Sequence, residues 1–299
     1  MANVADRILR KALRALDRRI SRHPDELLKE PFDPVDVRKF EEALRELPMP
    51  TEGARLYLQK HVGRLARTLA LVPPPASTGR ALELGCYMQI TPFLQQICGY
   101  KEVRGGYFGK LGKTDHKVLD LPRGRFECFV DLFDAERDRY PYPDGHFDLV
   151  IAGEIIEHMV LDPMHLLLES RRVLRDGGTL IVTTPNVGSL LSVAKVLEGK
   201  DNPQIFFLYG RPDASGCSET GHMREYTLSE LGEIVKAAGF EVDKLFTTFI
   251  EEFAHHRPIA TLLREHGYET ENRGEQSWCA ARKNAQAAVD RYPWFVYTE

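Results

Sequence analysis

The sequence predicts an α/β protein: a mostly parallel sheet of seven strands with helices on both faces, preceded by an N-terminal helical extension. Three observations predict it. Short apolar runs alternate with amphipathic stretches after residue 75, which is typical of chains that add strand and helix by turns. Residues 1 to about 75 show helical periodicity. The 299 residues, 43% hydrophobic and 28% charged, are enough for a sizeable core.

Composition also excludes several classes of protein. With a net charge of −4 and ordinary hydrophobic content, the chain is neither disordered, nor collagen-like, nor a disulfide scaffold. No apolar run approaches the roughly 18 residues of a membrane span, and the N-terminal segment has neither the apolar core nor the cleavage site of a secretory signal. The five cysteines form no CxxC pair, so we expect reduced thiols and a cytoplasmic protein.

The first 22 residues predict a basic amphipathic helix. Apolar side chains between residues 4 and 20 recur every three or four positions, and the other face carries seven Lys and Arg side chains against Asp6 and Asp17. Such a helix binds an anionic membrane, a nucleic acid or an acidic partner, or it packs its apolar stripe on the main domain.

Two further helices are expected at residues 35–47 and 51–71. The three prolines at 73–75 then end the helical region, because consecutive prolines cannot donate helical hydrogen bonds. We therefore divide the chain into a helical cap over residues 1–75 and a main domain over residues 76–299. The N-terminal helices also offer a surface through which two copies of the chain would form a homodimer.

The elements of the main domain follow in order. The expected strands are 80–84, 102–104, 126–130, 147–151, 179–183, 241–248 and 277–282. The expected helices are 91–98, 162–174, 188–197, 227–238 and 259–266. Little helical pattern separates the last two strands, so we expect an antiparallel edge there.

The first candidate site follows the first of these strands. In Ala-Leu-Glu-Leu-Gly-Cys, an apolar strand leads directly into Glu83 and Gly85, and a helix comes next. In an open α/β sheet, ligands bind beyond the carboxyl ends of the strands, and a glycine lets the backbone approach them. The same glycine would also serve an ordinary turn between strand and helix.

Two later motifs indicate the protein family in which such a site occurs. Phe-Asp-Leu-Val at 147–150 follows a polar turn, and Leu-Arg-Asp-Gly-Gly at 174–178 precedes another apolar strand. Together with the first motif, they resemble the class I S-adenosylmethionine-dependent methyltransferases over residues 78–283. The resemblance implies a Rossmann-like sheet and S-adenosylmethionine as cofactor. The cofactor-binding residues that it implies are Glu83, Gly85, Cys86, Tyr87, Asp131, Asp134, Ala135 and Glu154.

Within this set, Glu83 and Gly85 would line the methionine end of the cofactor. Asp134, or else Asp131, would accept a hydrogen bond from the adenine amino group, which a carboxylate suits because it only accepts. The alternative for both aspartates is capping of the turn that follows.

The chain departs from the family pattern at two positions. Tyr87 stands where a second glycine is common, and Gly106 stands where an acid usually holds the ribose. Ribose binding would then need another residue, such as Asp115 in the connection 107–124. The departures also leave open a relative that binds cofactor poorly and serves as a binding or scaffold subunit.

The most informative motif is Glu154-x-x-Glu157-His158, with His222 farther along the chain. In a helical turn, positions i, i+3 and i+4 share one face. The four residues resemble the metal site of small-RNA 3′-terminal 2′-O-methyltransferases and of ubiquinone-pathway O-methyltransferases. The resemblance implies that Glu154, Glu157, His158 and His222 bind one divalent ion, Mg, Mn, Fe or Zn. Alternatively, His158 or His222 is a catalytic general base without metal, or these side chains form routine hydrogen bonds at a solvated helix end.

We therefore expect an O-methyltransferase that acts on a hydroxyl of a small molecule, a sugar or a glycan intermediate. A divalent ion would activate and orient that hydroxyl. The broken aromatic segment 204–218 is the expected substrate-facing wall or lid, and His255 with His256 is expected in a solvated loop. An RNA 2′-O-methyltransferase is the rival enzyme, but the acidic chain shows no aromatic-basic platform for single strands.

Overall fold

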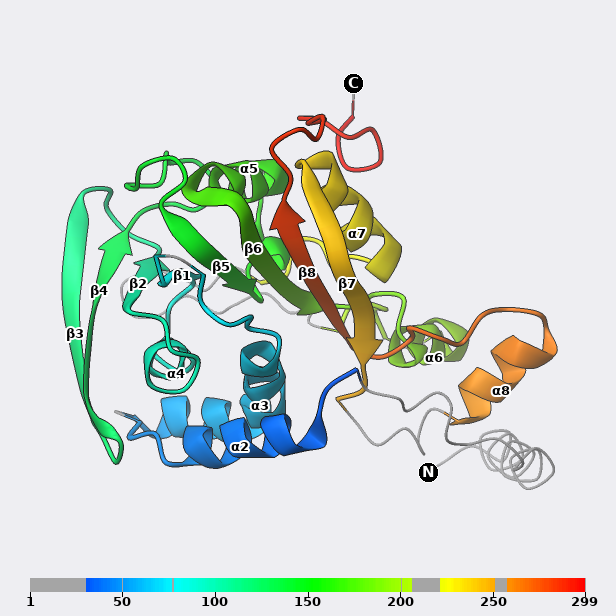
Figure 1. The fold of residues 1–299 in the computed structure, drawn as a ribbon. Helices are drawn as coiled ribbons and strands as arrows, with labels where there is room; N and C mark the ends of the chain where they lie inside the picture. The colour runs from blue at the N-terminus through cyan, green and yellow to red at the C-terminus, as the bar shows by residue number, and fades with distance from the viewer. Residues whose placement is uncertain are drawn as a thin grey trace, which may run out of the picture.

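An eight-stranded mixed sheet forms the centre of the computed structural model, which describes residues 31–49, 51–76, 78–199, 201–205, 221–250 and 257–298. The strand order is β3-β4-β2-β1-β5-β6-β8-β7 (Figure 1). The strands are β1 Arg80–Leu84, β2 Glu102–Tyr107, β3 Lys113–Leu121, β4 Gly124–Leu132, β5 Phe147–Gly153, β6 Leu174–Pro185, β7 Phe240–Thr248 and β8 Gln276–Lys283.

The middle of the sheet is parallel and both edges are antiparallel. Strands β4, β2, β1, β5 and β6 pair in parallel, whereas β3 pairs antiparallel with β4, and β8 pairs antiparallel with both β6 and β7. The antiparallel edge expected at the end of the chain is therefore confirmed.

The expected count of seven strands is one too low, because the connection 107–124 contains β3. This strand pairs with β4 from Lys113↔Leu132 to Leu121↔Gly124. Its side chains are exposed from Lys113 to Val118, so it lacks the alternation of buried and exposed positions by which strands are recognised in a sequence.

Helices cover both faces of the sheet (Figure 1). They are α2 Pro34–Arg45, α3 Glu52–Ala70, α4 Thr91–Gln96, α5 Pro163–Val173, α6 Leu190–Glu198, α7 Leu228–Ala237 and α8 Arg257–Glu265, with a short 3₁₀ helix, η2, at Ile156–His158. One core joins α5 and α7 to one face of the sheet, and a second joins α2, α3 and α4 to the other. Alternate residues of the central strands enter the two cores, so these strands are apolar throughout. Among the described residues, no helix is both long and apolar enough to cross a bilayer.

Helices α2 and α3 begin at side-chain caps and pack on the sheet. The Asp33 carboxylate accepts from the Val35 N–H, and the Thr51 hydroxyl accepts from the Ala54 N–H. Their buried side chains share a core with Trp278 of β8. The basic helix expected within residues 1–22 lies outside the described residues, and the boundary at residue 75 stays a prediction.

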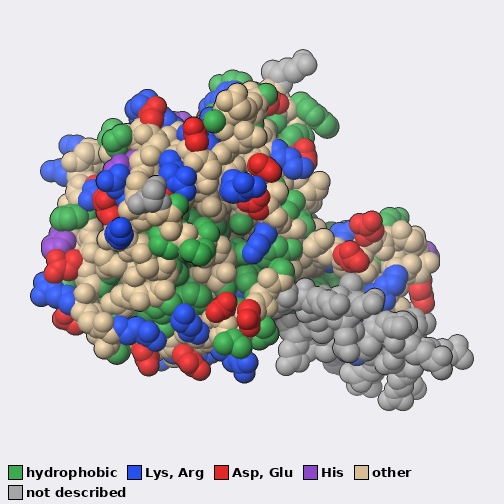
Figure 2. Space-filling model, in the orientation of Figure 1, with side chains coloured by type: hydrophobic (Ala, Val, Ile, Leu, Met, Phe, Trp, Pro, Cys, Tyr) green, Lys and Arg blue, Asp and Glu red, His purple; other side chains and the backbone are tan. Residues whose placement is uncertain are grey.

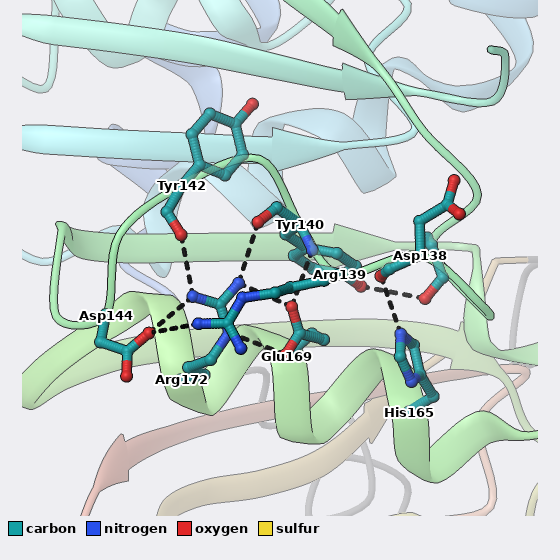
Figure 3. Close-up of polar contacts among 9 residues, drawn as sticks. Asp138, Arg139, Tyr140, Tyr142, Asp144, His165, Glu169 and Arg172 are labelled. Carbon is teal, nitrogen blue, oxygen red and sulfur yellow. Dashed lines mark hydrogen bonds and ion pairs between the residues drawn. The ribbon is translucent and has the colours of Figure 1, made fainter. Parts of the chain in front are cut away.

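The connection from β4 to β5 is held by one arginine of α5 (Figure 3). Arg172 donates to the carbonyls of Tyr140 and Tyr142, to the Asp144 carboxylate and twice to Glu169. These bonds use all five of its N–H groups. The Arg172 cluster, as we call these five residues, therefore fixes the return of the chain towards β5.

Charged side chains of both signs are interspersed over the face shown in Figure 2, with hydrophobic side chains between them. This face therefore carries a mixed charge pattern, whereas a nucleic-acid site usually presents a footprint of one sign.

Candidate active site

The strand order places a topological switch between β1 and β5. Strand β2, which follows β1 in the chain, lies next to β1 on one flank, and β5, which comes later in the chain, lies next to β1 on its other flank. Ligands of open α/β sheets bind in the crevice at the carboxyl ends of two such strands. Two residues there have left-handed backbone, Gly85 with φ of 65° and Glu154 with φ of 55°. Because such a conformation is unfavourable for a residue with a Cβ, Glu154 marks this end of β5 as a candidate functional site.

Glu154 points towards β6, β8 and α3. Its Oε1 accepts hydrogen bonds from the Thr183 hydroxyl at 2.7 Å and from the Gln276 amide at 2.8 Å. An Arg64 nitrogen of α3 lies 3.9 Å from the same oxygen, and the side chains of Arg64 and Glu154 are only 10% and 18% exposed. The end of β5 therefore carries a half-buried pair of opposite charges.

Glu157 follows in η2 and is fully buried. One carboxylate oxygen, Oε2, accepts from the Thr184 hydroxyl at 2.9 Å, but Oε1 has no hydrogen-bond partner among the described residues. Burial, together with the negative charge of Glu154, raises the pKa of Glu157 well above its ordinary value. An orphaned buried carboxylate oxygen is costly, so a native protein that keeps one commonly uses it for a ligand.

Two histidines complete this group. His222 lies with its Nε2 4.0 Å from Glu157 Oε1, and its ring meets the His158 ring edge to face at 4.7 Å between centroids. One nitrogen or oxygen from each of Glu157, His158 and His222 lies within 4.8 Å of the others, and no further group of this kind occurs in the described part of the chain. We call these three residues the Glu157 cluster.

Glu225 orients His222 and was not expected from the sequence. Its Oε1 lies 3.0 Å from His222 Nδ1, while its Oε2 accepts the Ile205 N–H at 2.8 Å. When Nδ1 carries the proton and donates a hydrogen bond to Glu225, Nε2 is the nitrogen with a free lone pair, and it faces Glu157. A carboxylate that accepts from the other ring nitrogen is the usual support of a metal-binding histidine. The spacing of three residues from His222 to Glu225 was the available signal.

The Glu157 cluster fits a divalent cation. A buried carboxylate oxygen without a partner and two imidazoles are donors of the kind that Zn, Mn and Fe accept. Of the four ligands expected from the sequence, the structure brings three together. Glu154, the fourth, is directed to Thr183 and Gln276.

At the end of β1, Glu83 is buried and accepts a hydrogen bond from the Thr91 hydroxyl. Burial raises its pKa to about 7, although the bond from Thr91 lowers it in part. A Cβ on Gly85 would lie 3.0 Å from the Ile155 Cδ1, tighter than an ordinary contact, and the φ of 65° also favours glycine between β1 and the segment after β5. Tyr87 is 60% exposed, beside Tyr57 and Tyr107, so its ring does not plug a buried cleft. The alternative of a scaffold subunit that binds cofactor poorly therefore loses the support that a cleft filled by Tyr87 would have given it.

The residues expected near the ribose and the adenine are engaged within the protein: Gly106 is closely packed, and Asp131 and Asp134 accept hydrogen bonds from other residues. A Cβ on Gly106 would lie 2.7 Å from the Phe133 ring. Asp131 binds Arg104 at 2.7 Å, the Thr114 hydroxyl at 2.6 Å and the Tyr142 hydroxyl at 2.8 Å.

Asp134 Oδ1 accepts the Glu136 N–H at 2.9 Å, which is the capping bond of a turn. Ala135 is half-buried against the core beside α5 and α7. Asp115 lies on the outer strand β3, 3.0 Å from Lys117. Cys86 is buried, Cys217 and the histidines at 255–256 lie outside the described residues, and so does most of the expected wall at 204–218.

The chain is similar to methyltransferases. A family model described as a methyltransferase domain matches residues 57–245. A Mycolicibacterium smegmatis protein named "Probable S-adenosylmethionine-dependent methyltransferase" is 31% identical over 138 residues, which are 46% of this chain and 44% of that protein. A malonyl-[acyl-carrier protein] O-methyltransferase of Marinomonas is 32% identical over 80 residues, 27% of this chain and 29% of that protein.

The solved structure of an S-adenosylmethionine-dependent methyltransferase from Archaeoglobus fulgidus aligns with a TM-score of 0.46 at 18% identity, over 76% of this chain and 99% of that one. The chain spans less than half the length of the curated relatives that it matches.

Proposed function

This chain belongs to the methyltransferase-domain family, and on that premise we propose that it is an S-adenosylmethionine-dependent O-methyltransferase acting on a hydroxyl of a small molecule or carbohydrate. The observation that carries the proposal is the Glu157 cluster beside the topological switch, with a fully buried carboxylate oxygen that lacks a partner. When bound, S-adenosylmethionine supplies an electrophilic methyl group on a sulfonium centre.

An acceptor hydroxyl is a weak nucleophile until it loses its proton. Glu157, His158 and His222 would hold one divalent cation, which lowers the pKa of a coordinated hydroxyl and orients it. Glu225 keeps His222 in the tautomer whose Nε2 faces the cluster. The O-methyltransferase name of one relative supports an oxygen atom as the methyl acceptor.

The same residues support a second route without metal. His222, oriented by Glu225, would then take the hydroxyl proton as general base. The orphaned oxygen of Glu157 favours the metal, because a general base at His222 leaves that buried carboxylate without a function.

Cofactor recognition would involve the charge pair at the end of β5. Arg64 donates to the Tyr57 hydroxyl at 2.9 Å and stands 3.9 Å from Glu154, too far for a tight ion pair. The amino-acid end of S-adenosylmethionine is a zwitterion, and a cation and an anion side by side complement it. We assign Arg64 to the carboxylate and Glu154 to the ammonium group.

Calorimetry on chelated protein tests the proposal in two steps. S-adenosylhomocysteine is titrated first, and added Zn²⁺ or Mn²⁺ second, on wild type and on His222→Ala. We expect both proteins to bind the nucleoside, and only wild type to take up one equivalent of metal. Absence of nucleoside binding to wild type would refute the methyltransferase, whereas nucleoside binding without metal uptake would leave the general-base route.

A further inference from the structure

Three sulfur atoms converge behind the turn that follows β1, outside the Glu157 cluster. The Cys86 Sγ lies 3.8 Å from the Met88 Sδ, and the Cys128 Sγ of β4 lies 3.6 Å from the same atom. Both thiols are free and buried, and Met88 is half-buried. The two cysteines are far apart in the sequence, so only the pairing of β1 and β4 with β2 brings them together.

The backbone accommodates this arrangement at a cost. Met88 has left-handed backbone with φ of 62°, which is unfavourable for a residue with a Cβ. Gly105 of β2 stands against the cluster, where a Cβ would lie 2.7 Å from the Cys86 Sγ. Met88 packs here against a small buried cluster that holds both cysteines together with Phe126 and Val130, so its thioether is held beside the two thiols.

The surroundings are protic rather than only apolar. The Cys86 Sγ lies 3.2 Å from the Thr91 hydroxyl, which in turn donates to the buried carboxylate of Glu83. Burial and the nearby Glu83 raise the pKa of Cys86 well above its ordinary value, and burial raises that of Cys128 to about 12. Both sulfurs are therefore protonated at neutral pH, and only a cation that bonds strongly to sulfur would displace those protons.

The donor set indicates the cation, and the spacing shows that an ion would fit. Two thiols and one thioether are soft ligands, which favour Cu(I) over hard divalent ions. With metal–sulfur bonds of about 2.3 Å, three sulfurs around one ion stand about 4 Å apart. The separations of the Met88 Sδ from the Cys128 and Cys86 sulfurs, 3.6 and 3.8 Å, need little adjustment.

We propose that Cys86, Met88 and Cys128 form a binding site for one soft monovalent cation, Cu(I). On binding, the ion forms one bond to each cysteine sulfur and accepts a lone pair from the Met88 Sδ. The two thiol protons leave to solvent, and no electron is transferred. The site is separate from the proposed catalytic metal, whose donors are nitrogen and oxygen.

Two matched multiple variants test this site. The first, Cys98→Ser with Cys217→Ser and Cys279→Ser, keeps only the proposed pair of thiols. The second, Cys86→Ser with Cys128→Ser, removes that pair and keeps the other three. Each protein competes with bicinchoninate for Cu(I) without oxygen, after circular dichroism has confirmed its fold.

Wild type and the first variant are expected to withdraw one equivalent of Cu(I), and the second to bind roughly 100-fold more weakly. The proposal would be overturned if the second variant withdrew as much Cu(I) as wild type, or if the first variant no longer withdrew one equivalent of Cu(I). It would also be overturned if wild type withdrew no Cu(I). X-ray absorption on the copper-loaded wild type needs no variant: a shell of three sulfurs is expected, and nitrogen or oxygen neighbours would contradict it.

Discussion

Two polar clusters of this molecule, the Arg172 cluster and the Glu157 cluster, differ in how far their charged groups are paired. In the Arg172 cluster, every N–H of the guanidinium has an acceptor, and both carboxylates that it meets are bonded to it (Figure 3). In the Glu157 cluster, a carboxylate lies fully buried with one oxygen unbonded, and the negative charge of Glu154 acts on it more strongly than the positive charge of Arg64.

The pKa values follow the same division. Burial alone would raise the pKa of Glu169, but its bonds to Arg172 and to the Tyr140 N–H hold it below its ordinary value. For Glu157, burial and Glu154 act in the same direction and raise the pKa well above its ordinary value. A hydrogen-bond network in which every group has a partner stabilises the fold. A network with an unpartnered buried carboxylate costs stability, which is typical of a binding or catalytic site.

The largest expected effect is on activity in Glu157→Gln. Removing the carboxylate removes a ligand of the proposed cation, so methyl transfer should fall by roughly 1,000-fold. The measurement is turnover of the acceptor that wild type methylates fastest in a panel of phenols, alcohols and sugars. Binding of S-adenosylhomocysteine serves as the control and should not change. A variant within tenfold of wild type would place the Glu157 cluster outside catalysis.

The next effect is on stability in Arg172→Met. Loss of the guanidinium leaves the Tyr142 carbonyl without its donor and the Glu169 carboxylate with the Tyr140 N–H but without its counter-charge, so the free energy of unfolding should fall by about 3 kcal/mol. Urea denaturation measures it. The matched control is Arg55→Met, whose exposed pair with Glu52 should contribute nothing measurable. Equal urea midpoints for the two variants would mean that the Arg172 cluster is not a structural support.

A smaller effect is expected at the pair of Arg64 and Glu154, whose charged groups lie 3.9 Å apart. Arg64→Met removes the proposed partner of the cofactor carboxylate, so S-adenosylhomocysteine should bind roughly 30-fold more weakly. Methylthioadenosine, which lacks the amino-acid end, should bind Arg64→Met and wild type alike. Equal weakening of both nucleosides would show that Arg64 acts on the fold and not on the carboxylate.

The smallest effect is a pair of opposite pH dependences in metal-free protein. Glu169, whose folded pKa is lowered, adds stability above its unfolded pKa of about 4.3, and this is lost as pH falls through the folded pKa. Glu157, whose folded pKa is raised, makes stability decline as pH rises above about 4.3.

Urea midpoints across pH separate the two. Glu169→Gln should flatten the acid side of the profile, and Glu157→Gln the neutral side. The same change of profile in both variants would remove the distinction between the clusters.

Much of this arrangement was predictable from the sequence. The alternation of apolar runs predicted the parallel strands, and the three combined motifs predicted the family, which the comparison confirms. Strand β3 could not be predicted, because an exposed edge strand buries no face and leaves no periodic pattern. The metal, the acceptor and the residues of the cofactor site stay predictions.

The candidate site shows where local spacing is insufficient. Positions i, i+3 and i+4 share a face only within a helix, and here the helical turn begins at Ile156, after the left-handed Glu154. Glu157 and His158 therefore meet His222, while Glu154 turns to Thr183 and Gln276. The sulfur cluster was missed because its two cysteines meet only through the strand order.

The central claim is that Glu157, His158 and His222 hold one divalent cation. An anomalous difference map from crystals soaked in Mn²⁺ or Zn²⁺ tests it most directly. The account predicts one strong peak within bonding distance of Glu157 Oε1 and of both imidazoles in wild type, and none there in Glu157→Gln. A wild-type map without that peak, or an unchanged peak in the variant, would contradict it.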